Sequence, residues 1–182
     1  NWGTVFKLCR PDVVFHLAAE TGTGQSLTEA NRHAMVNVSG TALMLDGLFA
    51  VKHVPRRFIL TSSRAVYGDG AWHSNDGSIF YPSGRTRRHL ETAEWDYTGL
   101  DGKPATPIHS QADQTQPKPI SVYGATKLTQ EHVIRAWTQA FGSDLSVLRL
   151  QNVYGPGQSL KNAYTGVLTF FAPRAAAGRA AA

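Results

Sequence analysis

The sequence has almost no cysteine and no long apolar run. Cys9 is the only cysteine among 182 residues, which excludes an internal disulfide and a zinc site built on several thiolates. No stretch reaches the roughly 20 apolar residues of a membrane span. The first residues also lack the apolar core of a signal peptide. We therefore expect a cytoplasmic protein with no membrane partner.

A concentrated basic region is also missing. Lys and Arg outnumber Asp and Glu by 18 to 13, but the longest basic stretch is the short segment 85–88. A nucleic-acid surface usually combines a basic stripe with interleaved aromatic residues, so we expect no nucleic-acid partner. The seven histidines show no spacing typical of metal ligands, and we expect no bound metal.

Three short apolar runs predict β-strands. They lie at residues 13–17, 58–60 and 145–150, and each is followed by residues rich in Gly, Ser, Thr or Asn. Runs of this kind are typical of parallel strands that are buried on both faces. Ligands of parallel sheets bind beyond the carboxyl ends of the strands, so we expect the functional residues just after these runs.

Two helical patterns separate the runs. The pattern from Asn31 to Val51 carries an apolar stripe that we expect to face the sheet: Met35, Val38, Ala42, Leu45 and Phe49. A second apolar line on that helix predicts a protein partner: Val36, Leu43 and Ala50. The other helix runs from Tyr123 to Phe141 and ends before Gly142. This alternation predicts the α/β class, a doubly wound parallel sheet of the Rossmann-like type.

A tyrosine and a lysine four residues apart open the second helix. Tyr123 and Lys127 therefore lie on one face, and a right-handed crossover brings Ser63, at the end of the preceding strand, to the same edge. The ammonium stabilises a phenolate, which can act as a base. Gly124 leaves space for a flat ligand. The combination predicts proton removal from an alcohol together with hydride transfer.

Four segments, in order, resemble the extended short-chain dehydrogenase/reductases, the NAD-dependent epimerase/dehydratase family that acts on nucleotide sugars. They are residues 13–19, 58–68, 121–127 and 148–157. Four ordered motifs are highly specific. The resemblance implies a Rossmann-like fold, NAD as cofactor, a nucleotide sugar as substrate and a homodimer.

The resemblance also implies roles for individual residues. Tyr123 is expected to be the catalytic base, Lys127 to bind the nicotinamide ribose, and Ser63 to hydrogen-bond the reacting hydroxyl. Further expected cofactor contacts are Leu17, Ala18, Ala19, Asn37, Thr61, Ser62 and Asn152, with Asn37 bracing the sheet edge. Expected substrate contacts are Thr23, Gln25, Ser26, Arg64 and Asn152, the last at the diphosphate.

One departure from the family concerns the organisation of the chain. The glycine-rich turn that holds the cofactor phosphates is not found in the sequence, so we expect this chain to be the middle of a longer protein. Residues 1–150 are expected to form a partial NAD-binding domain with an insertion at 69–119 over the active-site edge, including a small hairpin. Residues 151–182 are expected to begin a truncated substrate-binding region.

A second departure concerns the reaction. The 4,6-dehydratases of the family carry Asp-Glu after the Ser/Thr, where this chain has Arg64 and Ala65. The sequence therefore favours a nucleotide-sugar 4-epimerase. Segments 21–26, 63–67 and 153–159, with the long insertion, most resemble the bacterial dTDP-rhamnose 4-epimerase group. The resemblance implies that tightly bound NAD oxidises carbon 4 transiently and returns the hydride to the opposite face. Two alternatives stay open: a reductase or oxidase with the same residues, and a catalytically silent NAD(P)-binding member.

Overall fold

Strands and helices alternate along the chain. The computed structural model describes residues 2–159, 171 and 174–178. Two compact units are present, Asn1–Arg149 and Leu150–Ala182. The helices of the main layer are α1 (Trp2–Cys9), α2 (Ala30–His33), α3 (Gly40–Ala50) and α5 (Val122–Phe141). Its strands are β1 (Val13–His16), β2 (Arg57–Ser63) and β6 (Asp144–Leu150). Within the described part of the chain, no helix has the length and apolar character of a membrane span.

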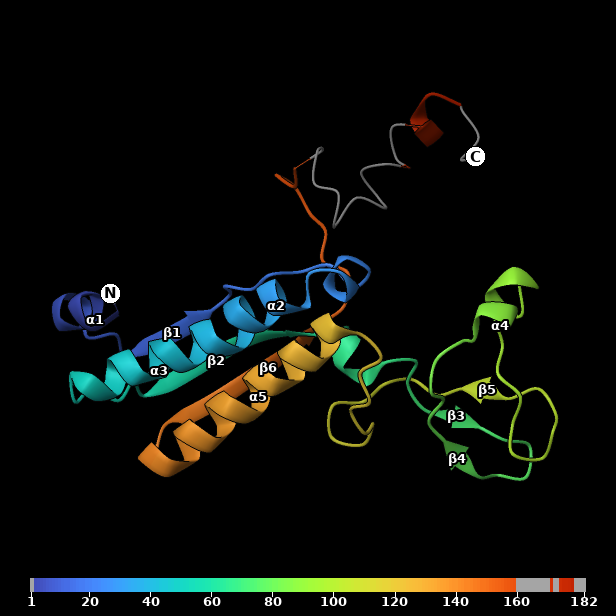
Figure 1. The fold of residues 1–182 in the computed structure, drawn as a ribbon, viewed down its shortest axis with the longest axis horizontal. Helices are drawn as coiled ribbons and strands as arrows, with labels where there is room; N and C mark the ends of the chain where they lie inside the picture. The colour runs from blue at the N-terminus through green and yellow to red at the C-terminus, as the bar shows by residue number, and fades with distance from the viewer. Residues whose placement is uncertain (1, 160–170, 172–173, 179–182) are drawn as a thin grey trace. The chain divides into compact units, whose positions relative to one another are not determined.

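The three strands form one sheet in the order β1-β2-β6 (Figure 1). Strands β1 and β2 pair in parallel, with Val13 opposite Arg57 and His16 opposite Leu60. The three strands predicted from apolar runs are thus confirmed. The helix predicted from Tyr123 to Phe141 is also confirmed. It is capped by the Ser121 side chain and ends at Gly142, whose positive φ of 73° suits glycine.

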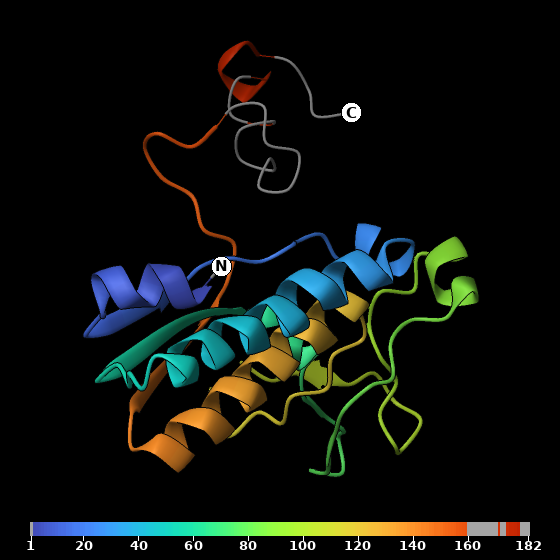
Figure 2. The ribbon, with the colours of Figure 1, turned by 60° about the vertical axis from the view of Figure 1, so that its left-hand side comes forward.

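The core lies between the sheet and helices α3 and α5, which run side by side (Figures 1 and 2). Leu48 of α3, Phe58 and Leu60 of β2, and Ile134 of α5 are all fully buried there. Burial of each such side chain contributes roughly 1.5–3 kcal/mol. Helix α1 packs against α3, with Phe6 in the same core. This layer fixes where the two helices begin at the sheet edge.

The strands are not buried on both faces, so that prediction is wrong. Alternate residues of β2 are buried, and those between them are only half-buried. Phe15 of β1 is 64% exposed, and Leu148 of β6 is also exposed. Apolar runs alone do not distinguish a strand covered on both sides from one covered on a single side.

The apolar stripe predicted to face the sheet is correct at Leu45, which is buried in the core, and wrong at its two ends. Met35 is 56% exposed and Phe49 is exposed as well, whereas the buried side of this helical segment carries His33, Asn37 and Thr41. Residues Ala34–Ser39 form a π-helix, η2, between α2 and α3. Its i→i+5 hydrogen bonds place more residues in each turn, so a stripe of period 3.6 drawn across it loses phase.

The insertion forms a small folded region of its own. Strands β3 (Trp72–His73), β4 (Ile79–Phe80) and β5 (Thr106–Pro107) make an antiparallel sheet in the order β4-β3-β5, and α4 spans Arg87–Glu91. The predicted hairpin is therefore one part of a three-stranded sheet. The ring of Trp72 lies edge-on to that of Tyr97, 5.0 Å between centroids.

Both ends of the insertion come together at its base. Gly68 has a φ of +62°, and a Cβ on it would lie only 2.2 Å from the carbonyl oxygen of Lys118. Any other side chain would be strained there and would clash with backbone. The glycine therefore allows the chain to leave and re-enter the main layer at one point.

Candidate active site

The segments after β1 and β2 meet the first turn of α5. The backbone N–H of Tyr123 donates to Ser26 Oγ at 3.0 Å, which joins α5 to the loop after β1. Gly124 lies against the turn after β2, since a Cβ on it would be 2.5 Å from the carbonyl oxygen of Ala65. The prediction that Gly124 leaves space for a ligand is therefore wrong: its missing side chain makes room for backbone.

Tyr123 is half-buried at this junction. Its ring lies edge-on to the ring of His33, with centroids 6.4 Å apart and an interplanar angle of 75°. Its backbone carbonyl accepts a hydrogen bond from Thr126 at 2.9 Å. The phenol therefore lies at the end of α5 that points to the sheet edge.

Lys127 lies one turn further along α5 and is 2% exposed. Burial lowers the pKa of its ammonium to about 8, against the opposing effect of the Glu131 carboxylate. Its Nζ donates to Gln130 Oε1 at 2.5 Å. Within the described residues this is its one acceptor, which leaves two of the three ammonium donors for a ligand.

Gln130 is itself held by neighbours from β1 and α3. Its Nε2 lies 2.9 Å from Thr41 Oγ1 and 3.2 Å from His16 Nε2, and His16 Nε2 lies 2.8 Å from Thr41 Oγ1. Burial, and then the positive charge of Lys127, lower the pKa of His16 to about 4. The imidazole is therefore neutral at pH 7, and the ammonium is the cation of this cluster.

A buried ion pair lies beside the ammonium. Arg149 of β6 binds both carboxylate oxygens of Glu131, with Nε–Oε1 at 3.0 Å and Nη2–Oε2 at 2.7 Å. Ser62 Oγ donates to the same carboxylate at 2.5 Å. The guanidinium also lies over the ring of Tyr67, 4.9 Å from its centroid. This group of residues ties β2, α5 and β6 together, and the hydrogen bonds to Glu131 raise the pKa of Arg149.

Ser63 ends β2 and begins the 3₁₀-helix η3 (Arg64–Tyr67). Its Oγ accepts a hydrogen bond from the backbone N–H of Ala65 at 3.1 Å. Arg64 is exposed. Ser62 and Ser63 therefore point to opposite sides of the strand, as the pleat requires, and only Ser62 joins the ion pair. Thr61, on the same side as Ser63, donates to the backbone carbonyl of His16 at 3.2 Å.

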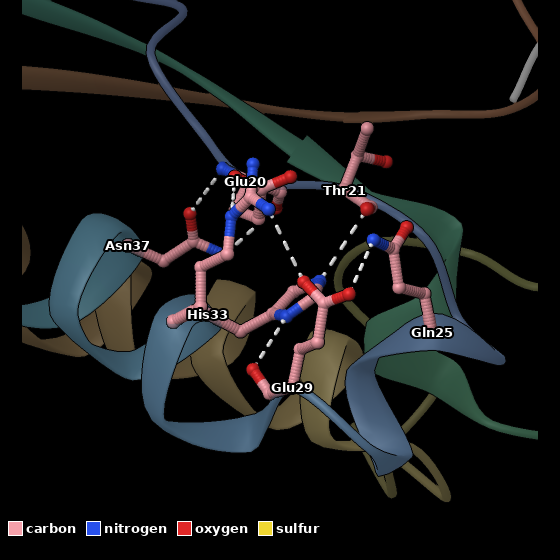
Figure 3. Close-up of polar contacts among 7 residues, drawn as sticks. Glu20, Thr21, Gln25, Glu29, His33 and Asn37 are labelled. Carbon is pink, nitrogen blue, oxygen red and sulfur yellow. Dashed lines mark hydrogen bonds and ion pairs between the residues drawn. The ribbon is translucent and has the colours of Figure 1, made fainter.

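Asn37 joins the loop after β1 to α5, and Figure 3 shows its contacts with Glu20 of that loop. Its Oδ1 accepts from the backbone N–H of Glu20 at 2.7 Å, and its Nδ2 donates to the carbonyl of Glu20 at 3.0 Å. The same Nδ2 group donates to Thr126 Oγ1 at 2.9 Å. The Asn37 side chain is fully buried. Its hydrogen bonds go to the backbone of Glu20 and the hydroxyl of Thr126, so it holds the loop in place.

The predicted substrate residues of this loop differ in exposure. Thr23 is exposed and Gln25 is half-buried, with its amide donating to Glu29 at 2.9 Å. Ser26 is fully buried, and its hydroxyl donates to the carbonyl of Thr23 at 2.7 Å while it accepts from Tyr123. The structure thus gives Ser26 a place in holding the loop to α5.

The remaining predicted residues lie in two places. Leu17, Ala18 and Ala19 are exposed just beyond β1, which leaves their surface open to a ligand. Asn152 belongs to the second compact unit. The roles predicted for it, and for the regions 1–150 and 151–182, stay predictions.

Several polar residues of the site were not predicted from the sequence. Gln130 and Glu131 lie three and four residues after Lys127, a spacing that places them on the buried side of α5. His16 falls inside an apolar run, which favours burial. In the described part of the chain no group of His, Cys, Asp and Glu is placed to hold a metal ion.

Comparison with known proteins matches the chain to the NAD dependent epimerase/dehydratase family over residues 1–88 and 97–181. It is 56% identical over 174 residues to the dTDP-L-rhamnose 4-epimerase of Burkholderia thailandensis, an alignment that covers 93% of this chain and 46% of that protein. The chain thus spans less than half the length of this relative.

Two solved structures share the fold. One is a UDP-N-acetylglucosamine 4-epimerase from Methanobrevibacter ruminantium, with a TM-score of 0.67 and 21% identity, covering 99% of this chain and 45% of that chain. The other is a UDP-glucose 4-epimerase from Thermotoga maritima with UDP-glucose, with a TM-score of 0.64 and 26% identity, covering 98% and 46%. The predicted α/β, Rossmann-like fold is confirmed.

Proposed function

We propose that this chain, which belongs to the NAD dependent epimerase/dehydratase family, carries the catalytic groups of a nucleotide-sugar 4-epimerase. The observation that carries the proposal is the pairing, on one side of α5, of the half-buried Tyr123 with the buried ammonium of Lys127. The 56% identity to a dTDP-L-rhamnose 4-epimerase supports a dTDP-linked sugar as substrate.

The residues of the site fit a nicotinamide cofactor. Lys127 keeps two ammonium donors beyond its bond to Gln130, which suit the two hydroxyls of a ribose. The exposed residues Leu17, Ala18 and Ala19 present apolar side chains beyond β1. NAD held by these residues would supply reversible hydride transfer at carbon 4 of the sugar.

Residues of this chain accept and return the proton of the reacting hydroxyl. Tyr123 accepts the proton of the sugar 4-hydroxyl, because its phenol is the titratable group that lies one turn before the Lys127 ammonium on the same side of α5. Ser63 hydrogen-bonds the same hydroxyl. When the keto sugar has turned its other face, Tyr123 returns the proton to the oxygen, so the product is an isomer and no proton is consumed.

Residues Arg64 and Ala65 favour epimerisation over elimination. A 4,6-dehydratase needs an acid and a base that remove water from the sugar. Arg64 carries a guanidinium, a group with donors only and no acceptor for a proton, and the methyl group of Ala65 carries no exchangeable proton. Neither residue can perform that step.

The test uses the full-length protein that carries this chain, a dTDP-sugar and NAD far below the sugar concentration. An epimerase converts many equivalents of sugar without net NADH. Tyr123→Phe should lower turnover by about 100-fold or more while nucleotide-sugar binding persists. The control Tyr81→Phe removes a hydroxyl that binds the backbone of Gln116 in the insertion, and its turnover should stay within about twofold of the wild-type value.

Other outcomes separate the alternatives. Stoichiometric NADH would identify a reductase or oxidase, and NAD binding with no turnover of any sugar would identify a catalytically silent member. Unchanged turnover in Tyr123→Phe would refute the role of the phenol.

We also propose that the protein is a homodimer that pairs through α3 and α5. Leu43 is 58% exposed, and Phe49 and Phe141, also exposed, lie 5.8 Å apart between ring centroids. An apolar surface shared by two adjacent helices is typical of a partner-binding face. A cytoplasmic location stays a prediction.

A further inference from the structure

We propose that His33 is a positioning residue which, with a proton on both ring nitrogens, holds the two ends of the loop 21–29 beside Tyr123. The structural part of this proposal is independent of the reaction. Its effect on substrate binding rests on the proposed epimerase function, in which this loop carries predicted substrate contacts.

Both ring nitrogens of His33 face backbone carbonyl oxygens (Figure 3). Nδ1 lies 3.0 Å from the oxygen of Glu29, and Nε2 lies 3.3 Å from the oxygen of Thr21. A carbonyl oxygen only accepts hydrogen bonds, and a neutral imidazole has a single N–H. A neutral ring would therefore point a lone pair at one of the two oxygens. Only the imidazolium form donates to both.

The ring has no access to water that could relieve such a contact, because His33 is fully buried. A buried polar group without a hydrogen-bond partner destabilises the state that contains it. The two carbonyls lie at opposite ends of the loop, so the ring links these two ends. We call this pair of hydrogen bonds, from His33 to Thr21 and Glu29, the clasp. Loss of one proton releases one end.

Charged groups also lie on the loop side of the ring (Figure 3). Glu29 and Glu20 are carboxylates, and both pair with the guanidinium of Arg32, at 3.3 Å and 2.9 Å. These pairs join the loop to the same helical turn that carries His33.

On the α5 side, two titratable groups face this region. Tyr123 presents its ring to His33 at 6.4 Å between centroids, and Lys127 directs its ammonium to Gln130. Contact between the His33 ring and the Tyr123 ring means that a change in the clasp also reaches the proposed base. Ser26 links the same loop to the backbone of Tyr123, so the loop and the phenol are positioned together.

The direct test is nitrogen NMR of the full-length wild-type protein labelled with ¹⁵N-histidine at pH 7. The His33 signal is assigned by its loss in His33→Phe, a substitution that keeps a flat ring and removes both donors. We expect protons on both ring nitrogens. A single protonated nitrogen at His33 in the wild-type protein would overturn the proposal.

Backbone hydrogen exchange of residues 21–29 tests the clasp. We expect exchange in the wild-type loop to accelerate as His33 deprotonates, and exchange in His33→Phe to be at least about tenfold faster at pH 7. The matched control is His53→Phe, which removes a ring nitrogen 2.9 Å from the carbonyl of Pro11, away from this loop. Equal loop exchange in His33→Phe and wild type refutes the clasp.

The kinetic readout is the split between KM and kcat. In His33→Phe we expect the KM for the nucleotide sugar to rise about tenfold with kcat within about threefold, and we expect the wild-type KM, but not that of the variant, to rise with pH. An unchanged KM would refute a role in substrate binding. Absence of epimerase turnover in the wild-type protein would refute the proposed function, while NMR and exchange still decide the role of His33.

Discussion

Replacement of Lys127 by Met should make the protein inactive and more stable at the same time. The structure buries this ammonium, and its pKa falls from 10.5 to about 8. A shift of that size corresponds to about 3 kcal/mol by which the fold disfavours the charged form. Methionine fills a similar volume without charge and loses the bond to Gln130, which contributes about 1 kcal/mol. The expected net gain at pH 7 is about 2 kcal/mol.

The pH dependence gives this prediction a second signature. Between pH 8 and 10.5 the unfolded chain keeps the Lys127 proton that the folded protein has lost, so wild-type stability rises with pH across this window. The variant has no such group, and its advantage should shrink over the same range.

Urea unfolding followed by circular dichroism from pH 7 to 10.5 measures both effects. Lys103→Met is the matched control, because Lys103 is exposed and its replacement should change stability by less than about 0.5 kcal/mol. A Lys127→Met protein that is less stable than wild type at pH 7, or a difference that stays constant with pH, would refute the reasoning.

Three further predictions concern stability and assembly. His16, with its pKa lowered to about 4, takes up a proton more readily when unfolded, so stability should fall as the pH drops from 6.5 to 4, and His16→Asn should flatten that slope in urea titrations. Glu131→Gln should lower the free energy of unfolding by about 3–5 kcal/mol, because it leaves Arg149 buried without its partner. The control Glu91→Gln, in an exposed ion pair, should lower it by less than about 1 kcal/mol. Equal losses in the two variants would contradict an effect of the buried pair. Leu43→Glu should convert the proposed dimer to a folded monomer, as measured by light scattering. A wild-type protein that is already monomeric at micromolar concentration would contradict the proposed dimer.

Sequence reasoning succeeded where a local pattern determines the structure. The apolar run of β2 and the glycine that ends α5, Gly142, each act within a few residues, so strand and helix were predicted correctly. The spacing of Tyr123 and Lys127 placed both residues on one side of α5 for the same reason.

It failed where a tertiary contact or an altered helical period decides. The π-helix η2 shifts the phase of the apolar stripe, which turned Met35 outward and Asn37 inward. Gln130 and Glu131 are polar residues of a helix, which usually face solvent. They are buried because Lys127, Ser62 and Arg149, which come from another turn or from strands, bind them. No local sequence pattern predicts these contacts.

The narrow base of the insertion has a consequence for how this chain can change in evolution. Because the chain leaves and returns beside Gly68 and Lys118, the segment between them can be exchanged without moving its two ends. Its small sheet, with Trp72 packed on Tyr97, can be lengthened or recomposed while Ser63, Tyr123 and Lys127 keep their positions. The residues proposed to carry the reaction and the residues of the insertion can therefore change independently of each other.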